Sequence, residues 1–238
     1  MVFTMNEQFI EFLATSGAIK FGVFTLKSGR QSPFFISTGV LCDGLSSYEL
    51  GKAYAAKINE KFGAGGSGSA GGRSKSGAGT DFDIIFGPAY KGIPLAVSVS
   101  IALQKEFGIN KPWLFDRKEK KIHGDAGVFV GCELDKDSRV VLVDDVMTTG
   151  ETKFEAIDKI KSYGANVVGI VIAVDRMEKG IRLNAIEEFT NKCGVPVYPI
   201  TNVKEIFDYL RNRSVGGKVY VNDSIYRSFI KYREKYGV

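Results

Sequence analysis

The chain has 238 residues, of which 44% are hydrophobic and 25% are charged, so it can bury a sizeable core. This composition excludes a disordered chain and a collagen-like fibre. The formal net charge of +5 is well below the basicity of a dedicated nucleic-acid-binding protein, and we expect no nucleic-acid partner.

The cysteines and the first residues indicate the compartment. Cys42, Cys132 and Cys193 are far apart and odd in number, which favours neither a disulfide framework nor a zinc site and indicates a reducing compartment. Glu7 and Glu11 interrupt the apolar residues near the start, unlike a signal peptide, and no apolar run approaches the length of a membrane span. The sequence therefore predicts a cytoplasmic protein with no membrane partner.

Hydrophobic periodicity predicts helices that alternate with strands along the chain. In order, the predicted elements are a helix over 5–15, a helix capped by Ser46 and ending near Phe62, a strand over 82–86, a helix over 93–107, a strand over 139–143, a helix ending near Tyr163, strands over 166–174 and 195–200, and helices near 203–212 and 223–235. Continuous Val/Ile strands separated by helices are typical of a parallel sheet covered on both faces. We expect an α/β fold with one domain over residues 1–238.

Residues 63–80 interrupt this pattern. They contain eight of the 28 glycines and no large apolar side chain, so burial cannot offset the entropy of ordering them. A phosphate-binding glycine loop would need a strand before it and a helix after it. We interpret the segment as a flexible insertion in the domain, either natural or an engineered linker.

Residues 144–150 follow the strand predicted over 139–143 and carry the strongest chemical signal. Ligands of open parallel sheets bind at the carboxyl ends of the strands. Asp144 and Asp145 offer oxygens to vicinal hydroxyls or to a divalent cation. The turn Thr148-Thr149-Gly150 opens a helix, and its hydroxyl and N–H groups suit a phosphate. An Asp-Asp pair alone usually lies in a solvated loop, but its position between a buried strand and this turn favours a ligand-binding site.

This stretch resembles the 5-phosphoribosyl 1-pyrophosphate (PRPP) signature of the type I phosphoribosyltransferases. Further segments resemble, in family order, those of the orotate phosphoribosyltransferases: 24–30 with 32–35, 87–94, 116–119 with 123–124, 174–176 and 232–238. The resemblance covers nearly the whole chain outside residues 63–80. It implies the type I phosphoribosyltransferase fold, a central parallel sheet flanked by helices with a small hood from the N-terminal and C-terminal segments.

The resemblance also implies roles for individual residues. The implied catalytic residues are Lys27, Lys121, His123, Asp144 and Asp145. The implied contacts to PRPP and pyrophosphate come from Tyr90, Lys91, Arg117, Lys118, Lys121, His123, Asp144, Asp145, Val146, Met147, Thr148, Thr149, Gly150, Glu151 and Thr152. The implied contacts to orotate come from Lys27, Phe35, Ile36, Thr148 and Arg176.

The implied cofactor is Mg²⁺, bound mainly through PRPP, with Asp144 and Asp145 acting at most through water. The implied assembly is a homodimer in which the 117–127 loop closes on the partner subunit's site. Association with a separate orotidine monophosphate decarboxylase is a further expectation.

Several of these motifs have plain structural alternatives. Lys27 and Arg30 beside a Ser-Gly turn suit a flat anionic base, but they equally suit an exposed strand-end charge pair. Arg176 offers a bidentate fork to the orotate carboxylate, or it forms a structural ion pair with Asp175 or Glu178. The run of charges over 117–125 would by itself be a solvated face.

The chain also departs from the family pattern. Ile36 and Ser37 stand where an aromatic residue and an asparagine are common. Lys120 and Ile122 make the loop more cationic, which predicts tighter pyrophosphate binding with a steeper salt dependence. Glu151 replaces a small residue, and we expect it to point outward as a first-turn helix acid.

The resemblance implies transfer of phosphoribosyl from PRPP to orotate, which yields orotidine 5′-monophosphate and pyrophosphate in UMP synthesis. Two alternatives stay open: another type I phosphoribosyltransferase, and a non-catalytic regulator that senses PRPP. Neutral purines give no reason for the cationic residues near Lys27 and Arg176. A regulator is expected to carry an added helix-turn-helix or a contiguous basic face; the first residues show neither, and the catalytic-loop pattern is intact.

Overall fold

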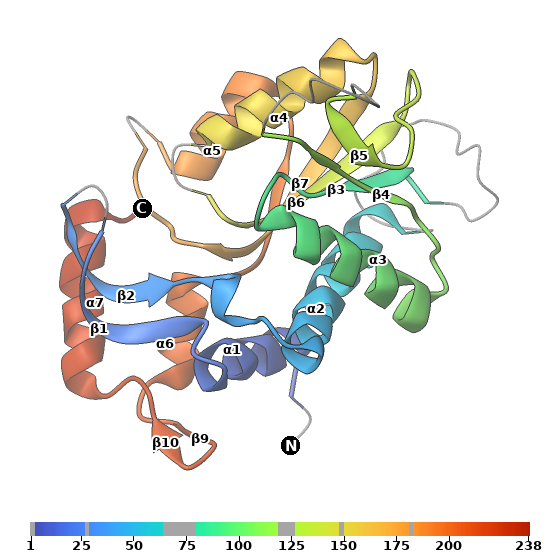
Figure 1. Cartoon of the computed structure of the whole chain (residues 1–238). Coiled ribbons are helices and arrows are strands. Elements are labelled where there is room, and N and C mark those ends of the chain that lie inside the picture. The colour runs from blue at the N-terminus through green and yellow to red at the C-terminus, as the bar shows by residue number, and fades with distance from the viewer. Residues whose placement is uncertain (1–2, 27–28, 64–79, 119–126, 148–149, 181–182) are drawn as a thin grey trace.

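The computed structural model describes residues 3–26, 29–63, 80–118, 127–147, 150–180 and 183–238 (Figure 1). In this part of the chain a six-stranded sheet has the order β5-β4-β3-β6-β7-β8. Its strands are β3 (Ile84–Phe86), β4 (Trp113–Asp116), β5 (Phe129–Gly131), β6 (Arg139–Val146), β7 (Asn166–Asp175) and β8 (Val197–Asn202). All neighbours pair in parallel except the edge strand β5, which is antiparallel to β4. The predicted central parallel sheet is confirmed.

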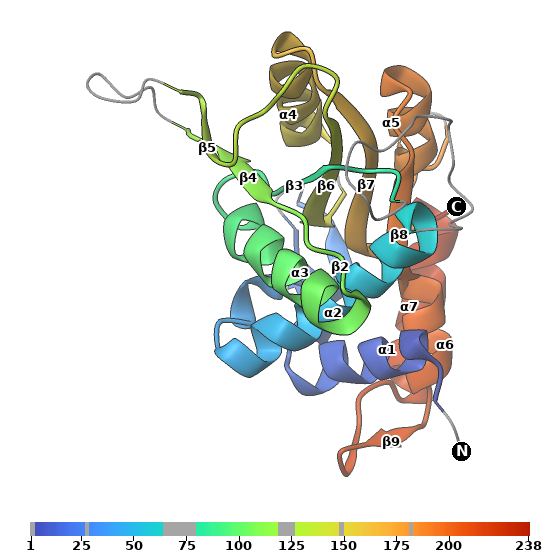
Figure 2. The same cartoon turned by 90° about the vertical axis from the view of Figure 1, so that its right-hand side faces the viewer.

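Helices cover both faces of this sheet (Figures 1 and 2). One face packs against α2 (Gly44–Phe62) and α3 (Gly92–Phe107), and the other against α4 (Glu151–Ser162) and α5 (Ala185–Cys193). Successive strand residues point to opposite faces, so in β6 Val141 joins the first core and Leu142 the second. Strands buried on both faces explain the continuous Val/Ile runs.

The remaining elements form the predicted hood, which joins the two ends of the chain (Figure 1). They are α1 (Met5–Thr15), β1 (Ile19–Thr25), β2 (Gln31–Ile36), the 3₁₀ turn Thr38–Val40, α6 (Val203–Leu210), β9 (Ser214–Val215), β10 (Lys218–Val219) and α7 (Asp223–Tyr236). Aromatic packing holds the hood together. The rings of Phe207 and Phe229 stack with centroids 3.8 Å apart, and Phe34 of β2 meets both edge-on at 5.8 and 6.3 Å.

Two predicted boundaries are wrong for identifiable reasons. The cap of α2 is Asp43, not Ser46: the Ser46 N–H donates to Asp43 Oδ1 at 3.0 Å, and the Asp43 N–H donates to Ser46 Oγ in a capping box. The strand predicted to end at 143 continues through Val146, because residues 144–146 still pair with β7. The two aspartates therefore belong to the strand instead of leaving it.

The ends of the predicted insertion lie close together, and residues 64–79 fall outside the described residues. The Asp81 N–H donates to the Phe62 carbonyl at 2.9 Å, and Thr80 is buried. That residues 63–80 are an insertion in a single domain stays a prediction. Among the helices of the described residues, none has the length and hydropathy needed to cross a membrane.

Candidate active site

The carboxyl ends of β3, β6 and β7 are neighbours in the sheet and carry most of the described candidate residues. Asp144 is opposite Ile172 of β7, and Val146 is opposite Val174, two residues before Arg176. The loop after β3 leads through Tyr90 and Lys91 into α3. The sheet thus brings three features to one edge: the acidic pair Asp144 and Asp145, the loop of residues 87–92 (the glycine loop below) and Arg176. Ligand sites of parallel sheets lie at this edge.

Asp144 is held from inside the protein. Its Oδ2 forms an ion pair with Lys153 Nζ, its Oδ1 accepts from the Asp145 N–H at 2.9 Å, and its carbonyl accepts from the Tyr54 hydroxyl at 2.7 Å. Lys153 also donates to the Val146 carbonyl at 2.9 Å, and the residue is only 3% exposed. Asp144 therefore faces a buried cation.

The sequence carries a signal for the buried position of Lys153. Lys153 lies on the buried side of α4 with Ala156, Ile157 and Ile160, at the spacing of an apolar helix stripe. A lysine within such a stripe needs a buried anion, and Asp144 is that anion.

Asp145 is held more loosely. Its Oδ1 accepts from the Val146 N–H at 2.8 Å, and its Oδ2 lies 3.2 Å from Lys91 Nζ. The Lys91 side chain is 62% exposed, so water screens this pair and it contributes little stability. Lys91 can therefore leave Asp145 at small cost when a polyanion arrives.

The glycine loop between β3 and α3 is braced by a buried acid. Asp116, at the end of β4, accepts from the Ala89 N–H at 2.9 Å and from Lys159 Nζ at 2.6 Å. A Cβ on Gly87 would overlap the Gly92 carbonyl, so the backbone can close this tightly only with glycine. Tyr90, at the tip, is 69% exposed. The supporting role of Asp116 follows only from this packing.

The turn before α4 also requires glycine. Gly150 has φ +76°, and a Cβ there would lie 2.6 Å from the Phe189 ring. Glu151 and Thr152 are exposed on the first turn of α4, whereas the Met147 side chain is buried in the core beneath them. Only the Met147 backbone can therefore face a ligand. Thr148 and Thr149 lie outside the described residues.

Arg176 follows β7 and is 9% exposed. Its Nε and Nη2 donate to Glu178 Oε1 at 3.0 and 2.6 Å, and its Cζ lies 4.6 Å from the centre of the Phe34 ring. The ion pair with Glu178 is thus present. The strand period of two turns Phe35 outward, at 42% exposure, and buries the Ile36 side chain in the hood.

The remaining candidates lie on the loops. Arg117 follows β4, and its buried Nε has no hydrogen-bond partner within the described residues, while Lys118 is exposed. A buried guanidinium nitrogen left in this way suits an anionic ligand. Lys27, Lys121 and His123 lie outside the described residues.

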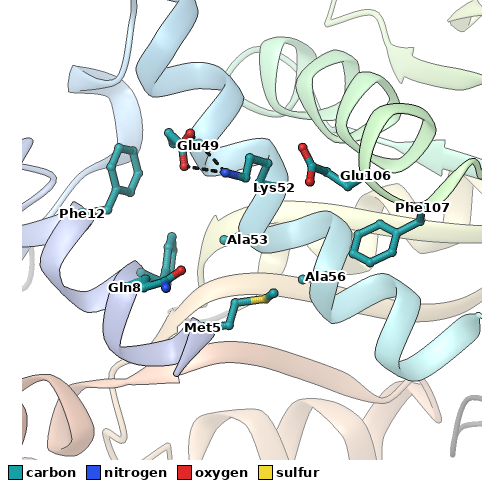
Figure 3. Close-up of a pocket in the computed structure, with 10 residues that line it drawn as sticks. Met5, Gln8, Phe12, Glu49, Lys52, Ala53, Ala56, Glu106 and Phe107 are labelled. Atoms are coloured by element: carbon teal, nitrogen blue, oxygen red, sulfur yellow. Dashed lines mark hydrogen bonds and ion pairs between the residues drawn. The ribbon is translucent and has the colours of Figure 1, made fainter. Parts of the chain in front are cut away.

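A separate pocket opens between α1, α2 and α3 (Figure 3). Phe12 and Phe107 line it together with Glu49 and Lys52, which form an ion pair at 3.2 Å. Phe107 ends α3, about 22 Å along the helix axis from the glycine loop that precedes it. This pocket therefore lies away from the carboxyl edge.

Comparisons with known proteins identify the family. Residues 52–198, more than half of the chain, match the model of the phosphoribosyl transferase domain. The chain is 44% identical over 242 residues to the orotate phosphoribosyltransferase of Bifidobacterium animalis subsp. lactis (strain AD011), with 100% of both chains covered. It is 40% identical over 235 residues to that of Clostridium acetobutylicum, with 98% of both covered.

A solved structure shows the same relationship. The crystal structure of orotate phosphoribosyltransferase from Francisella tularensis superposes with a TM-score of 0.78 at 35% identity, covering 97% of this chain and 100% of that one. The similarity extends beyond the transferase domain into the hood at both ends of the chain. The chain therefore belongs to the orotate phosphoribosyltransferase family of type I phosphoribosyltransferases.

Proposed function

We propose that the chain transfers phosphoribosyl from PRPP to orotate, which yields orotidine 5′-monophosphate and pyrophosphate in the synthesis of UMP. The observation that carries the proposal is the contact of Lys91 with Asp145 at 3.2 Å. It joins the glycine loop, which suits pyrophosphate, to the strand whose acids suit ribose hydroxyls. Arg176 follows the neighbouring strand and supplies a cation for an anionic base.

The two aspartates have different roles at the ribose site. Asp144 is held by Lys153 and fixes the orientation of the end of β6. Asp145 exchanges its exposed Lys91 partner for the ribose hydroxyls, because that ion pair is weak in water. The 5-phosphate binds at the turn 148–150, where the N-terminus of α4 provides N–H groups and a positive dipole.

Released Lys91 then turns to the pyrophosphate, together with Arg117, Lys118, Lys121 and His123. Arg117 supports this role because its buried Nε lacks a partner in the described structure. Lys121 acts mainly on the leaving group, so Lys121→Ala should lower turnover. An unchanged turnover rate would exclude that role.

The reaction is a displacement at the anomeric carbon of the ribose. A nitrogen of orotate forms the new C–N bond as the C–O bond to pyrophosphate breaks, with inversion, and positive charge develops on the ribose. The protein needs no covalent nucleophile. Its residues orient both substrates, stabilise the departing anion and exclude water that would hydrolyse the donor.

The donor set fits a Mg²⁺ ion that is bound mainly by PRPP. The described residues contain no group of three or more His, Cys, Asp or Glu side chains able to hold a metal. Asp144 is engaged by Lys153, which leaves Asp145 to act through water. When bound, the ion would neutralise charge on the pyrophosphate.

Orotate binds between the hood and the end of β7. Arg176 receives its carboxylate, the exposed ring of Phe35 covers its flat face, and Lys27 and Thr148 complete the site. Since the Ile36 side chain is buried, Ile36 contributes its backbone only.

The active form is a cytoplasmic homodimer in which the 117–127 loop closes over the partner subunit's site. A separate orotidine monophosphate decarboxylase can associate with it.

One assay tests the activity: consumption of orotate by the purified chain with PRPP and Mg²⁺. Orotate should be consumed with release of pyrophosphate, whereas adenine and hypoxanthine should not replace it. Binding of PRPP without turnover would favour a regulator. Mixing a Lys121 variant with an Arg176 variant should restore some activity if sites are shared, and verified heterodimers without restored activity would refute shared sites.

A further inference from the structure

The Glu178 carboxylate collects donors from three parts of the chain. Its Oε1 accepts from Arg176 Nε and Nη2, and also from the Tyr232 hydroxyl of α7 at 2.7 Å. Its Oε2 lies 4.0 Å from Arg30 Nη1, beside β2. The Glu178 side chain is 17% exposed. Burial and the bond to Glu178 raise the pKa of Tyr232 to about 12, so its hydroxyl stays a donor at neutral pH.

The backbone around Glu178 is fixed from the same direction. The Lys179 N–H donates to the Tyr236 carbonyl at 2.8 Å, and the Val238 N–H donates to the Met177 carbonyl at 3.1 Å. Glu178 and Gly237 thereby form an antiparallel bridge. The last turn of α7 and residues 237–238 therefore hold the segment that directly follows Arg176.

Resting on the proposed function, we propose that Glu178, supported by Tyr232, is a positioning residue that orients Arg176 toward the orotate carboxylate. Glu178 engages the side of the guanidinium formed by Nε and Nη2. An arginine can also bind a carboxylate with two hydrogen bonds from its second edge, which is formed by the two Nη atoms. Phe34 stacks on the guanidinium face and restrains its plane.

The direction in which Glu178→Gln changes orotate binding distinguishes two roles for Glu178. As a mere negative charge near the substrate, Glu178 would repel orotate, and Glu178→Gln would tighten orotate binding. As a positioning group, Glu178 restrains an otherwise flexible arginine, and the same substitution would weaken orotate binding. Glutamine keeps the size of the side chain and one oxygen acceptor, so the variant isolates the loss of the charged partner.

The test measures KM for each substrate separately. We expect Glu178→Gln to raise the KM for orotate about ten-fold, as for a lost charge-assisted contact, and to change the KM for PRPP less than about two-fold. Tyr232→Phe should raise the orotate KM about three-fold, and the double variant should match Glu178→Gln alone, because Tyr232 acts through Glu178. Tyr226→Phe is the matched control, since its hydroxyl donates from the same helix to Asp208 at 2.6 Å.

Three results would overturn the proposal: an orotate KM that falls or stays constant in Glu178→Gln, equal rises in both KM values, or a Tyr232 effect that adds fully to that of Glu178. If Glu178→Gln fails to fold, the orotate KM of Tyr232→Phe alone tests the proposal, because that substitution removes only one hydroxyl. Arg176→Lys separates this proposal from the proposed function. Wild-type protein that does not consume orotate refutes the function, whereas an active wild type whose orotate KM depends on Arg176 but not on Glu178 or Tyr232 refutes only the positioning role.

Discussion

Replacing Lys153 by methionine tests how much of the site depends on its buried ion pair. The Lys153 and Asp144 side chains are 4% and 14% exposed, and Lys153 also bonds the Val146 carbonyl. Removing one partner of a buried pair typically costs about 3–5 kcal/mol, because the other charge stays buried without compensation. Asp144 keeps its bond from the Asp145 N–H, so we expect the lower end, about 3 kcal/mol.

The assay is thermal and urea unfolding of the purified variant. For a chain of this size, about 3 kcal/mol corresponds to a melting temperature lower by about 6–12 °C. Lys153→Met combined with Asp144→Asn should regain at least half of the loss, because no unpaired charge is then buried. The coupling free energy between the two sites should therefore be at least about 1.5 kcal/mol, and larger by the cost of Asp144→Asn alone. The KM for PRPP should rise in Lys153→Met, since the strand end that leads into the phosphate turn loses its brace.

Lys161→Met is the matched control, because Lys161 lies exposed on the same helix and should change stability by less than about 0.5 kcal/mol. A Lys153→Met melting temperature within about 2 °C of wild type would refute the argument. So would a double-mutant cycle with coupling below about 0.5 kcal/mol, since residues in contact should couple more strongly.

Three further predictions concern the frame around the site. Gly150→Ala should destabilise by about 3 kcal/mol in urea unfolding, because it combines a positive φ with a clash against Phe189. Replacing residues 64–79 by four glycines should preserve orotate consumption and add about 1 kcal/mol of stability, since the loop closed by its neighbours becomes four-fold shorter. Asp83→Asn should lower stability at pH 7 by about 2 kcal/mol, because Asp83 loses its charge-assisted bonds from Arg139. Burial alone would raise the pKa of Asp83, but Arg139 outweighs it and the pKa is lowered, so the difference from wild type should narrow as the pH falls below about 4.

Each of these has its own control or contrary result. Gly17 also has a positive φ, +74°, but a Cβ there would lie in open space. Gly17→Ala should therefore destabilise the protein less than Gly150→Ala, and equal losses of stability would exclude the clash with Phe189. Loss of folding on shortening 64–79 would contradict the insertion. Asp81→Asn should have a smaller effect than Asp83→Asn, because Asp81 lies 3.8 Å from Arg139, and a pH-independent Asp83 effect would contradict the ionic origin.

The local sequence pattern predicts the parallel sheet and the edge that carries the candidate site, whereas the hood was implied only by the family resemblance. Runs such as RVVLV are apolar at every position, which only a strand buried on both faces requires, and the acids after them fall at the carboxyl end by chain direction. The pattern missed helix α5 and the strands β1, β2, β4, β5, β9 and β10. Strands of two to four residues show too little periodicity, and the apolar side of α5 comprises few residues. The longer strands β1 and β2 lie outside the main sheet and lack its continuous Val/Ile runs.

Only the tertiary structure decided which charges face one another. Lys153 and Asp144 are nine residues apart on different elements, and Glu178 and Tyr232 are separated by 54 residues. The sequence left open whether Arg176 serves the ligand or an ion pair, because both uses need the same residue at the same strand end. The fold shows that the ion pair is present, because Arg176 donates to Glu178, which also accepts from Tyr232 of α7. Periodicity fixes which face of an element is buried, but the partners of a buried charge depend on how distant elements pack.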